Sequence, residues 1–222
     1  MRLTVFNGSP RGKQSNTKIL MEHFSRGFTE NAGNTVETVY LNRTGETEGH
    51  VELFKQAEHA ILAFPLYTDA MPGIVKHFIE AIAPAAGSKN NPGIGFVIQS
   101  GFPEPSHSRY VGRYMEKLAK RLDCPHTGTV IRGGVEGIQV QPPWMTRKFF
   151  RYFYDLGKEH ASSGRFNEKI IRELAPRERM SFARRVFFRF LVFTGLANMF
   201  WNMKLKENNA FEKRFAHPFK QF

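Results

Sequence analysis

Apolar residues along the chain follow two spacings, short continuous or alternating runs and longer stretches with a helical period. The run Ala60–Phe64 is apolar without interruption, which is typical of a strand buried on both faces. Ile19, Leu20 and Phe28 recur at helical spacing. Together these patterns predict strands at residues 2–6, 35–41, 60–64, 94–99 and 127–132, and helices at 16–31, 51–57, 72–83 and 108–122.

Strands and helices alternate in this pattern, and most connections between them are short. Such an order predicts a parallel sheet covered by helices on both faces, wound through right-handed crossovers. Five strands that end near residue 132 match the size of a flavodoxin-like α/β fold. We therefore expect a five-stranded sheet of strand order 2-1-3-4-5.

A helical C-terminal extension follows the predicted sheet. Gly133-Gly134 and Gln141-Pro142-Pro143 mark the change, and a helical period resumes at Met145. We expect a sheet domain at residues 1–140 and an extension at 141–222 that packs on that domain or on a partner subunit. The extension is predicted to contain helices at 146–162, 167–174 and 178–205.

The charge of the chain is concentrated in this extension. Of the net charge of +12, residues 1–140 carry +2 and residues 141–222 carry +10, together with 14 of the 22 phenylalanines. A basic excess attracts nucleotides, nucleic acids or anionic membrane surfaces without distinguishing among them. The single cysteine excludes disulfide frameworks, multi-cysteine zinc sites and iron–sulfur clusters held by the protein. No secretory segment is recognised at Met1, so a reducing, cytoplasmic location is expected.

The loop after the first predicted strand, residues 7–17, is rich in polar donors. It leads into a helix, whose N-terminus offers free N–H groups and a partial positive charge to a phosphate. The spacing fits neither a Walker A motif nor a dinucleotide-binding glycine motif. Hydroxyl, amide and guanidinium donors are expected from Ser9, Arg11, Ser15, Asn16 and Thr17.

Two further loops are expected at the same edge of the sheet, because ligands bind there beyond the carboxyl ends of parallel strands. Pro65–Pro72 could place apolar side chains on the faces of a flat ring and backbone groups at its edge. In the segment 99–104, a glycine would let the backbone approach a ligand closely. The candidate contacts in these loops are Pro65, Leu66, Tyr67, Thr68, Met71, Ser100, Gly101 and Phe102.

The three loops together resemble the NADPH-dependent FMN reductase family, which has a flavodoxin-like fold. The resemblance covers roughly residues 1–140, and the phosphate loop here is one residue longer than the family pattern, with three residues between Arg11 and Ser15 instead of two, which leaves the role of Lys13 open. It implies an enzyme with bound FMN that takes a hydride from NADPH or NADH and passes electrons to a second substrate. It also implies a homodimer, and no catalytic side chain or metal is required. A basic site would favour the anionic form of the reduced flavin.

Several alternatives stay open. The electron acceptor could be a quinone, a flavin, an azo or nitro compound, or a metal ion. A flavodoxin-like electron carrier without NAD(P)H activity is one competing hypothesis, and a membrane-surface interaction protein is another. Residues 177–206, in which Arg177 and Arg179 begin a run of arginines among phenylalanines, could cover the sheet domain, form a dimer interface, contact an anionic membrane or help to build the pocket. Without a recognised binding fold, no nucleic-acid partner is expected.

Isolated reactive residues have simpler interpretations. Cys124 lacks the spacing to Arg132 of a phosphatase loop and is predicted to be structural. Asp69 and His107 are expected at exposed loop positions. Glu136 could lie beside the site of a partner subunit, but a surface glutamate is the simpler interpretation.

Overall fold

The structure is a computed structural model that describes residues 1–102, 104, 106–175 and 182–217. The chain divides into two compact units, Met1–Glu178 and Arg179–Phe222, and each is described by itself.

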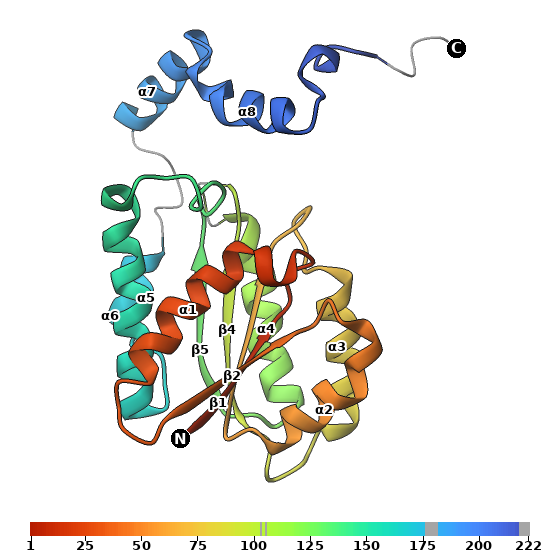
Figure 1. Cartoon of the computed structure of the whole chain (residues 1–222). Coiled ribbons are helices and arrows are strands. Elements are labelled where there is room, and N and C mark those ends of the chain that lie inside the picture. Colours follow the sequence, from red (N-terminus) through yellow and green to blue (C-terminus); the bar gives the residue numbers. More distant parts are fainter. Residues whose placement is uncertain (103, 105, 176–181, 218–222) are drawn as a thin grey trace. The chain divides into compact units, whose positions relative to one another are not determined.

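The first unit is built on a five-stranded parallel sheet of order β2-β1-β3-β4-β5 (Figure 1). Both the strand order and the parallel pairing predicted from the sequence are confirmed. Phe6 lies opposite Leu62, and Leu62 lies opposite Phe96, so these three residues are aligned across the central strands. The strands are β1 (Arg2–Asn7), β2 (Thr35–Tyr40), β3 (His59–Pro65), β4 (Gly93–Gln99) and β5 (His126–Arg132).

Helices follow each strand of the sheet, as the alternation predicts. Ser15 begins the first helix by accepting a hydrogen bond at Oγ from Lys18 N, and left-handed Gly164 ends the fifth. Asn167 caps the short sixth helix by accepting bonds from Lys169 N and Ile170 N. The helices are α1 (Asn16–Phe28), α2 (Thr47–Gln56), α3 (Gly73–Ile82), α4 (Arg109–Arg121), α5 (Pro143–Ser163) and α6 (Glu168–Leu174).

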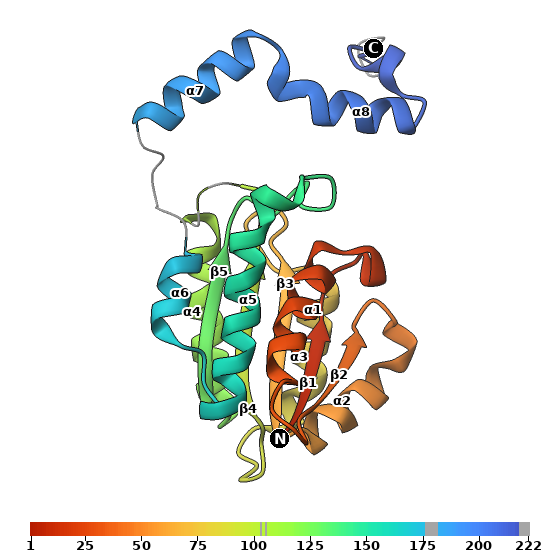
Figure 2. The same cartoon turned by 60° about the vertical axis from the view of Figure 1, so that its left-hand side comes forward.

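The helices form a layer on each face of the sheet (Figure 2). On one face, Phe6, Phe64 and Phe96 pack against α2, α3 and α4. On the other, Leu3 and Val5 pack against α1 and α5. Two separate apolar clusters therefore fix the sheet from both sides, as a doubly wound fold requires.

Helices α1 and α5 touch through their main chains. A Cβ added to Gly27 would lie 1.9 Å from Tyr154 O, and one added to Gly157 would lie 1.9 Å from Phe24 O. No side chain fits at either position. The two glycines thus bring the helices closer than side chains would allow, beside the buried Phe24 and Phe28.

The compact unit continues well past residue 140, where composition led us to expect the domain boundary. Helix α5 supplies Phe153 and Leu156 to the buried cluster over the sheet. The segment before α6 also lies along β5, because Phe166 N donates to Thr127 O at 2.8 Å. The first part of the expected extension therefore belongs to the sheet domain, and the second unit begins only at Arg179.

The second unit contains α7 (Phe182–Phe193) and α8 (Met199–Glu207). The single helix predicted at 178–205 is wrong, because the chain turns at Gly195, which has φ +74°. This left-handed conformation is readily available only to glycine and cannot continue a right-handed helix. Arg177 and Arg179, with which the predicted arginine run begins, lie outside the described residues.

A buried histidine lies between α1 and the sheet. His160 is 1% exposed, its ring is 5.2 Å from that of His59, and Phe24, Phe28 and Phe166 surround it. Burial, with a smaller effect from His59, lowers the pKa of His160 to about 4. The imidazole is therefore neutral in the folded protein at neutral pH.

Replacing Gly157 tests the contact between the helices. We expect Gly157→Ala to lower the free energy of unfolding by about 2–3 kcal/mol, because α1 and α5 must separate. Gly49→Ala in α2 is the matched control, since nothing lies within 4 Å of its added Cβ. It should be neutral or stabilise by up to about 1 kcal/mol. Urea denaturation measures both, and equal effects would contradict the close contact.

Acid should destabilise the fold through His160. In the unfolded state His160 is protonated below its ordinary pKa of 6.5, whereas in the folded state it is protonated only below about pH 4. The free energy of unfolding therefore decreases as the pH falls below 6.5, by about 2 kcal/mol at pH 5. We expect His160→Phe to flatten this part of the curve of unfolding free energy against pH. An unchanged slope would show that His160 is not the group responsible.

Candidate functional site

Three loops meet at the carboxyl edge of the sheet, at the ends of β1, β3 and β4. These strands are neighbours, and Pro65 at the end of β3 lies opposite Gln99 at the end of β4. Gly8 N donates to Ala63 O, and Leu66 N donates to Gln99 O, so each loop is attached to the strand beside it. The topology thus brings together the three segments that the sequence singled out.

The loop after β1 is organised by Asn7, whose side chain is fully buried. Asn7 Oδ1 accepts from Ser9 N at 3.0 Å, and Asn7 Nδ2 donates to Ser15 Oγ at 3.2 Å. Ser15 Oγ also donates to Gly12 O at 2.6 Å. This network holds the loop against the start of α1, and Ser15 is largely occupied as the helix cap.

Polar side chains at the start of α1 are buried. Ser9, Asn16 and Thr17 are each no more than 5% exposed. Asn16 Nδ2 donates to Val135 O at 3.0 Å, and Gln99 Nε2 donates to Thr17 Oγ1 at 3.4 Å. These bonds tie the helix N-terminus to the end of β4 and to the loop after β5. The result is a fixed group of donors beside the positive end of a helix dipole, where an anion is favoured.

The loop after β3 makes a tight turn. Tyr67 N donates to Ala70 O and Ala70 N donates to Tyr67 O, while Thr68 and Asp69 have φ values of +47° and +60°. Non-glycine residues adopt this left-handed conformation at a cost in free energy, and such strain is commonly found at functional sites. The Tyr67 side chain remains 44% exposed.

An exposed pair joins this turn to the loop after β4. Asp69 Oδ1 lies 2.8 Å from His107 Nδ1, and the His107 ring stacks on Phe102 at 4.6 Å. Asp69 and His107 are exposed, as expected, but they contact each other, which their separation of 38 residues did not reveal. The contact holds the two loops side by side with Phe102 at the surface.

A small cavity of about 30 Å³ lies where the three loops meet. Arg11 Nη1 and Glu136 Oε1 lie 3.6 Å apart beside it, and both side chains are more than one third exposed. A cavity of this size holds about one water molecule, so a larger ligand must lie over the loops or displace this ion pair. The residues that line it are Ser9, Arg11, Asn16, Pro65, Leu66, Tyr67, Gln99, Ser100, Gly101 and Glu136.

The cavity unites eight of the thirteen residues proposed from the sequence and adds two others, Gln99 and Glu136. Glu136 faces Gly101, where an added Cβ would lie 3.2 Å from Glu136 Cβ. Glu136 therefore lines the site of its own chain, and its position after a glycine pair was the only signal for it in the sequence. Gln99 could have been found as the last residue of a strand whose end was already singled out.

The remaining proposed residues lie around the cavity without lining it. Ser15 caps α1, and Thr17 is buried beneath the loop. Met71 packs against the apolar cluster, Thr68 forms the turn, and Phe102 lies on His107. Leu66, although it lines the cavity, is 5% exposed and also belongs to that cluster.

The described lining of the cavity carries one cation, Arg11, and one carboxylate, Glu136. The basic excess of the chain is therefore not concentrated here. Cys124 is buried, and burial raises the pKa of its thiol to about 11, which agrees with its predicted structural role. Among the described residues, no three His, Cys, Asp or Glu side chains are grouped to hold a metal ion.

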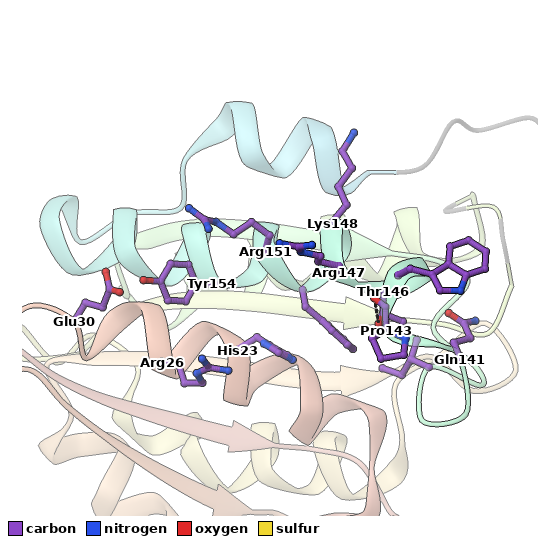
Figure 3. Close-up of a pocket in the computed structure, with 13 residues that line it drawn as sticks. His23, Arg26, Glu30, Gln141, Pro143, Thr146, Arg147, Lys148, Arg151 and Tyr154 are labelled. Carbon is purple, nitrogen blue, oxygen red and sulfur yellow. Dashed lines mark hydrogen bonds between the residues drawn. The ribbon is translucent and has the colours of Figure 1, made fainter.

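A larger groove of about 1180 Å³ lies elsewhere, between α1 and α5 (Figure 3). His23, which lines it, stacks on Phe150 at 4.1 Å, and burial lowers the pKa of His23. Arg26, Arg147 and Arg151 also line the groove. None of the three loops contributes to it, so it is separate from the site at the sheet edge.

Comparison with known proteins identifies the fold. Residues 1–93 match the model of a family described as having a flavodoxin-like fold. The chain thus has the flavodoxin-like fold that the sequence predicts. The comparison with curated proteins gave no match.

Solved structures of this fold are similar to the chain at low sequence identity. One is an FMN-dependent NADH-azoreductase from Bacillus anthracis in complex with FMN, at 16% identity and a TM-score of 0.56. The match covers 73% of this chain and 99% of the azoreductase chain. An NAD(P)H:quinone oxidoreductase from Methanothermobacter marburgensis has 14% identity and a TM-score of 0.57, covering 72% and 96%. The Trp repressor binding protein from Bacillus subtilis has 18% identity and a TM-score of 0.52, covering 71% and 96%.

The coverage figures have a structural consequence. The azoreductase is matched over nearly its whole length, yet more than a quarter of this chain lies outside the match. This chain therefore contains a segment with no counterpart in that structure.

Proposed function

We propose that this flavodoxin-like chain is an FMN-dependent NAD(P)H oxidoreductase. The observation that carries the proposal is the convergence of the three loops at the sheet edge, with buried polar groups at the N-terminus of α1. Bound FMN would accept a hydride from a nicotinamide donor and deliver electrons to a second substrate. The names of the azoreductase and the quinone oxidoreductase support this reaction class.

The donor set fits the phosphate of FMN. Ser9 presents a hydroxyl beside the start of α1, and Arg11 follows it on an exposed position of the same loop. Helix N–H groups, a hydroxyl and a guanidinium are the groups that bind a phosphate in proteins. In this proposal Asn7 and Ser15 hold the loop in shape and Arg11 supplies the charge.

The two neighbouring loops fit a flat ring. Gly101 lines the cavity where the loop after β4 reaches it, and Glu136 lies against the position that a side chain there would take. Tyr67 and Phe102 are the exposed aromatic residues of these loops. The contact between Asp69 and His107 would keep both loops in place around the ring.

The expected homodimer and the identity of the acceptor stay predictions. Quinones, flavins, azo or nitro compounds and metal ions are the acceptor classes to assay. A flavodoxin-like electron carrier is the second candidate function.

The spectrum of the protein with FMN tests the proposal. Protein supplied with FMN and then washed should retain a flavin absorption spectrum. This spectrum should bleach within seconds when NADPH or NADH is added without oxygen. The protein should then turn over repeatedly with an acceptor. Retained flavin that neither donor bleaches would favour the electron carrier. Loss of all flavin on washing would overturn the cofactor assignment.

The ion pair beside the cavity gives a second test with two opposite outcomes. We expect Arg11→Gln to weaken FMN binding about tenfold, because a charge-assisted bond to the phosphate is lost. Glu136→Gln should tighten binding about two- to fivefold, because it removes a negative charge and frees Arg11. Fluorescence titration with FMN measures both.

The matched control is Arg43→Gln. Arg43 forms an exposed ion pair with Glu46 at 3.4 Å that does not line the cavity, so FMN affinity should not change. Weaker binding in Glu136→Gln would show instead that the carboxylate contacts the cofactor.

A further inference from the structure

The part of the second unit that the structure describes, residues 182–217, has no apolar core of its own. Among residues 182–217, no residue whose side chain the structure describes is buried. Large apolar side chains are instead exposed, including Phe190 at 57%, Phe193 at 90% and Trp201 at 60%. Burial of apolar side chains is the main favourable contribution to folding. Exposed apolar side chains in this number therefore indicate a surface that binds an apolar partner or phase.

Charge is arranged in a definite order along α7 and α8. Arg185 and Arg189 are one turn apart on α7, so they share a face. The run 190–203 then has no charged residue, and Lys204 and Lys206 follow in the last turn of α8. The cations therefore lie on the two outer parts of the helix pair, and the uncharged stretch, which is apolar apart from Thr194, Asn198 and Asn202, lies between them.

The bend at Gly195 determines where the charged and uncharged parts of the helix pair lie. The segments Arg185–Phe193 and Leu196–Glu207 meet at 84°. The apolar end of α7 and the apolar beginning of α8 consequently lie at the apex, while the cations lie toward the open ends. No single helix in the described ranges is long and apolar enough to cross a membrane, and this bent pair meets the criteria of length and composition only when its two helices are taken together.

We propose that the C-terminal helix pair, residues 182–207, inserts its apex into one leaflet of an anionic lipid bilayer. The apolar apex would lie among the acyl chains, and the four cations named above would lie at the level of the lipid phosphates. The occupant of this surface is thus a membrane with anionic headgroups. The proposal is independent of the proposed function, because it concerns residues outside the flavodoxin-like unit.

The dimensions fit a single leaflet. At 1.5 Å per residue, the four residues 190–193 extend about 6 Å and the eight residues 196–203 about 12 Å. Half of the hydrocarbon core of a bilayer is about 15 Å thick. The uncharged part of each arm, which includes Asn198 and Asn202 in the second, is therefore short enough to remain within one leaflet.

Chemistry favours lipid over a protein partner. The last turn of α7, Phe190–Phe193, is apolar on every side, whereas a helix docked on a protein usually keeps one polar face toward water. Residues 182–217 carry seven basic and two acidic residues, a net charge of +5 that complements anionic headgroups. Trp201 follows the apex, and tryptophan is enriched at membrane interfaces.

Co-sedimentation of the full chain with vesicles tests the proposal. We expect binding to vesicles of phosphatidylcholine with 30% phosphatidylglycerol, chosen as an anionic probe, and weaker binding to phosphatidylcholine alone. Phe193→Asp with Leu196→Asp should reduce the partition coefficient about tenfold or more, because carboxylates would enter the acyl region. Arg185→Glu with Arg189→Glu should reduce binding to the anionic vesicles specifically.

A matched control uses exposed aromatic residues of the first unit. Tyr110→Asp with Tyr114→Asp changes two exposed side chains of α4 and should leave vesicle binding unchanged. Circular dichroism and thermal unfolding verify that each variant is folded.

The two tryptophans allow insertion to be measured directly. In Trp144→Phe, Trp201 is the only tryptophan, and brominated lipids should quench its fluorescence. In Trp201→Phe, the fluorescence of Trp144 in the first unit should not be quenched.

Three results would overturn the proposal. The first is a full-length chain that stays in the supernatant with both kinds of vesicle. The second is an apex variant that binds vesicles as the unchanged chain does. The third is an apex variant that alters only the oligomeric mass in the absence of lipid, which would assign this surface to contact between copies of the chain.

Discussion

The close contact of α1 with α5 is the constraint on which the arrangement of the first unit depends. Gly27 and Gly157 let the main chains meet near the C-terminal end of α1, and this fixes the axis of that helix over the sheet. The other end of the same helix begins at Ser15 and holds the loop after β1. Packing at one end of α1 therefore determines where the polar groups at its other end lie. The candidate site thus depends on residues that contact no ligand.

The general fold could be predicted from the sequence because its signals are local. Ala60–Phe64 is a buried strand by composition alone, and alternation with helices limits the sheet to few topologies. The domain boundary could not be placed from charge, because α5 is basic on its exposed side and apolar toward the sheet. Gly195 shows a different limit, since a single glycine in an apolar stretch can be tolerated in a helix or end it.

The site could be predicted only in part, because some of its contacts join residues that are far apart in the sequence. Loops after β1, β3 and β4 are found from the strand order, and most proposed residues do lie there. The pairing of Arg11 with Glu136 joins residues 125 positions apart, and no local pattern encodes it. That pair also makes the cavity nearly neutral, although the chain carries a net charge of +12. Total charge therefore gave little information about the electrostatics of this site.

The segment that leads into α6 has a consequence for how copies of this chain can meet. By pairing Phe166 N with Thr127 O, it covers part of β5, which is one edge of the sheet. The other edge is β2, six residues long with the exposed Glu37 within it. Short, charged or covered edges discourage the strand-to-strand addition that leads to aggregation. Ordered self-association of the sheet domain would accordingly use its helical faces, and misassembly through continuous sheets is disfavoured at both edges.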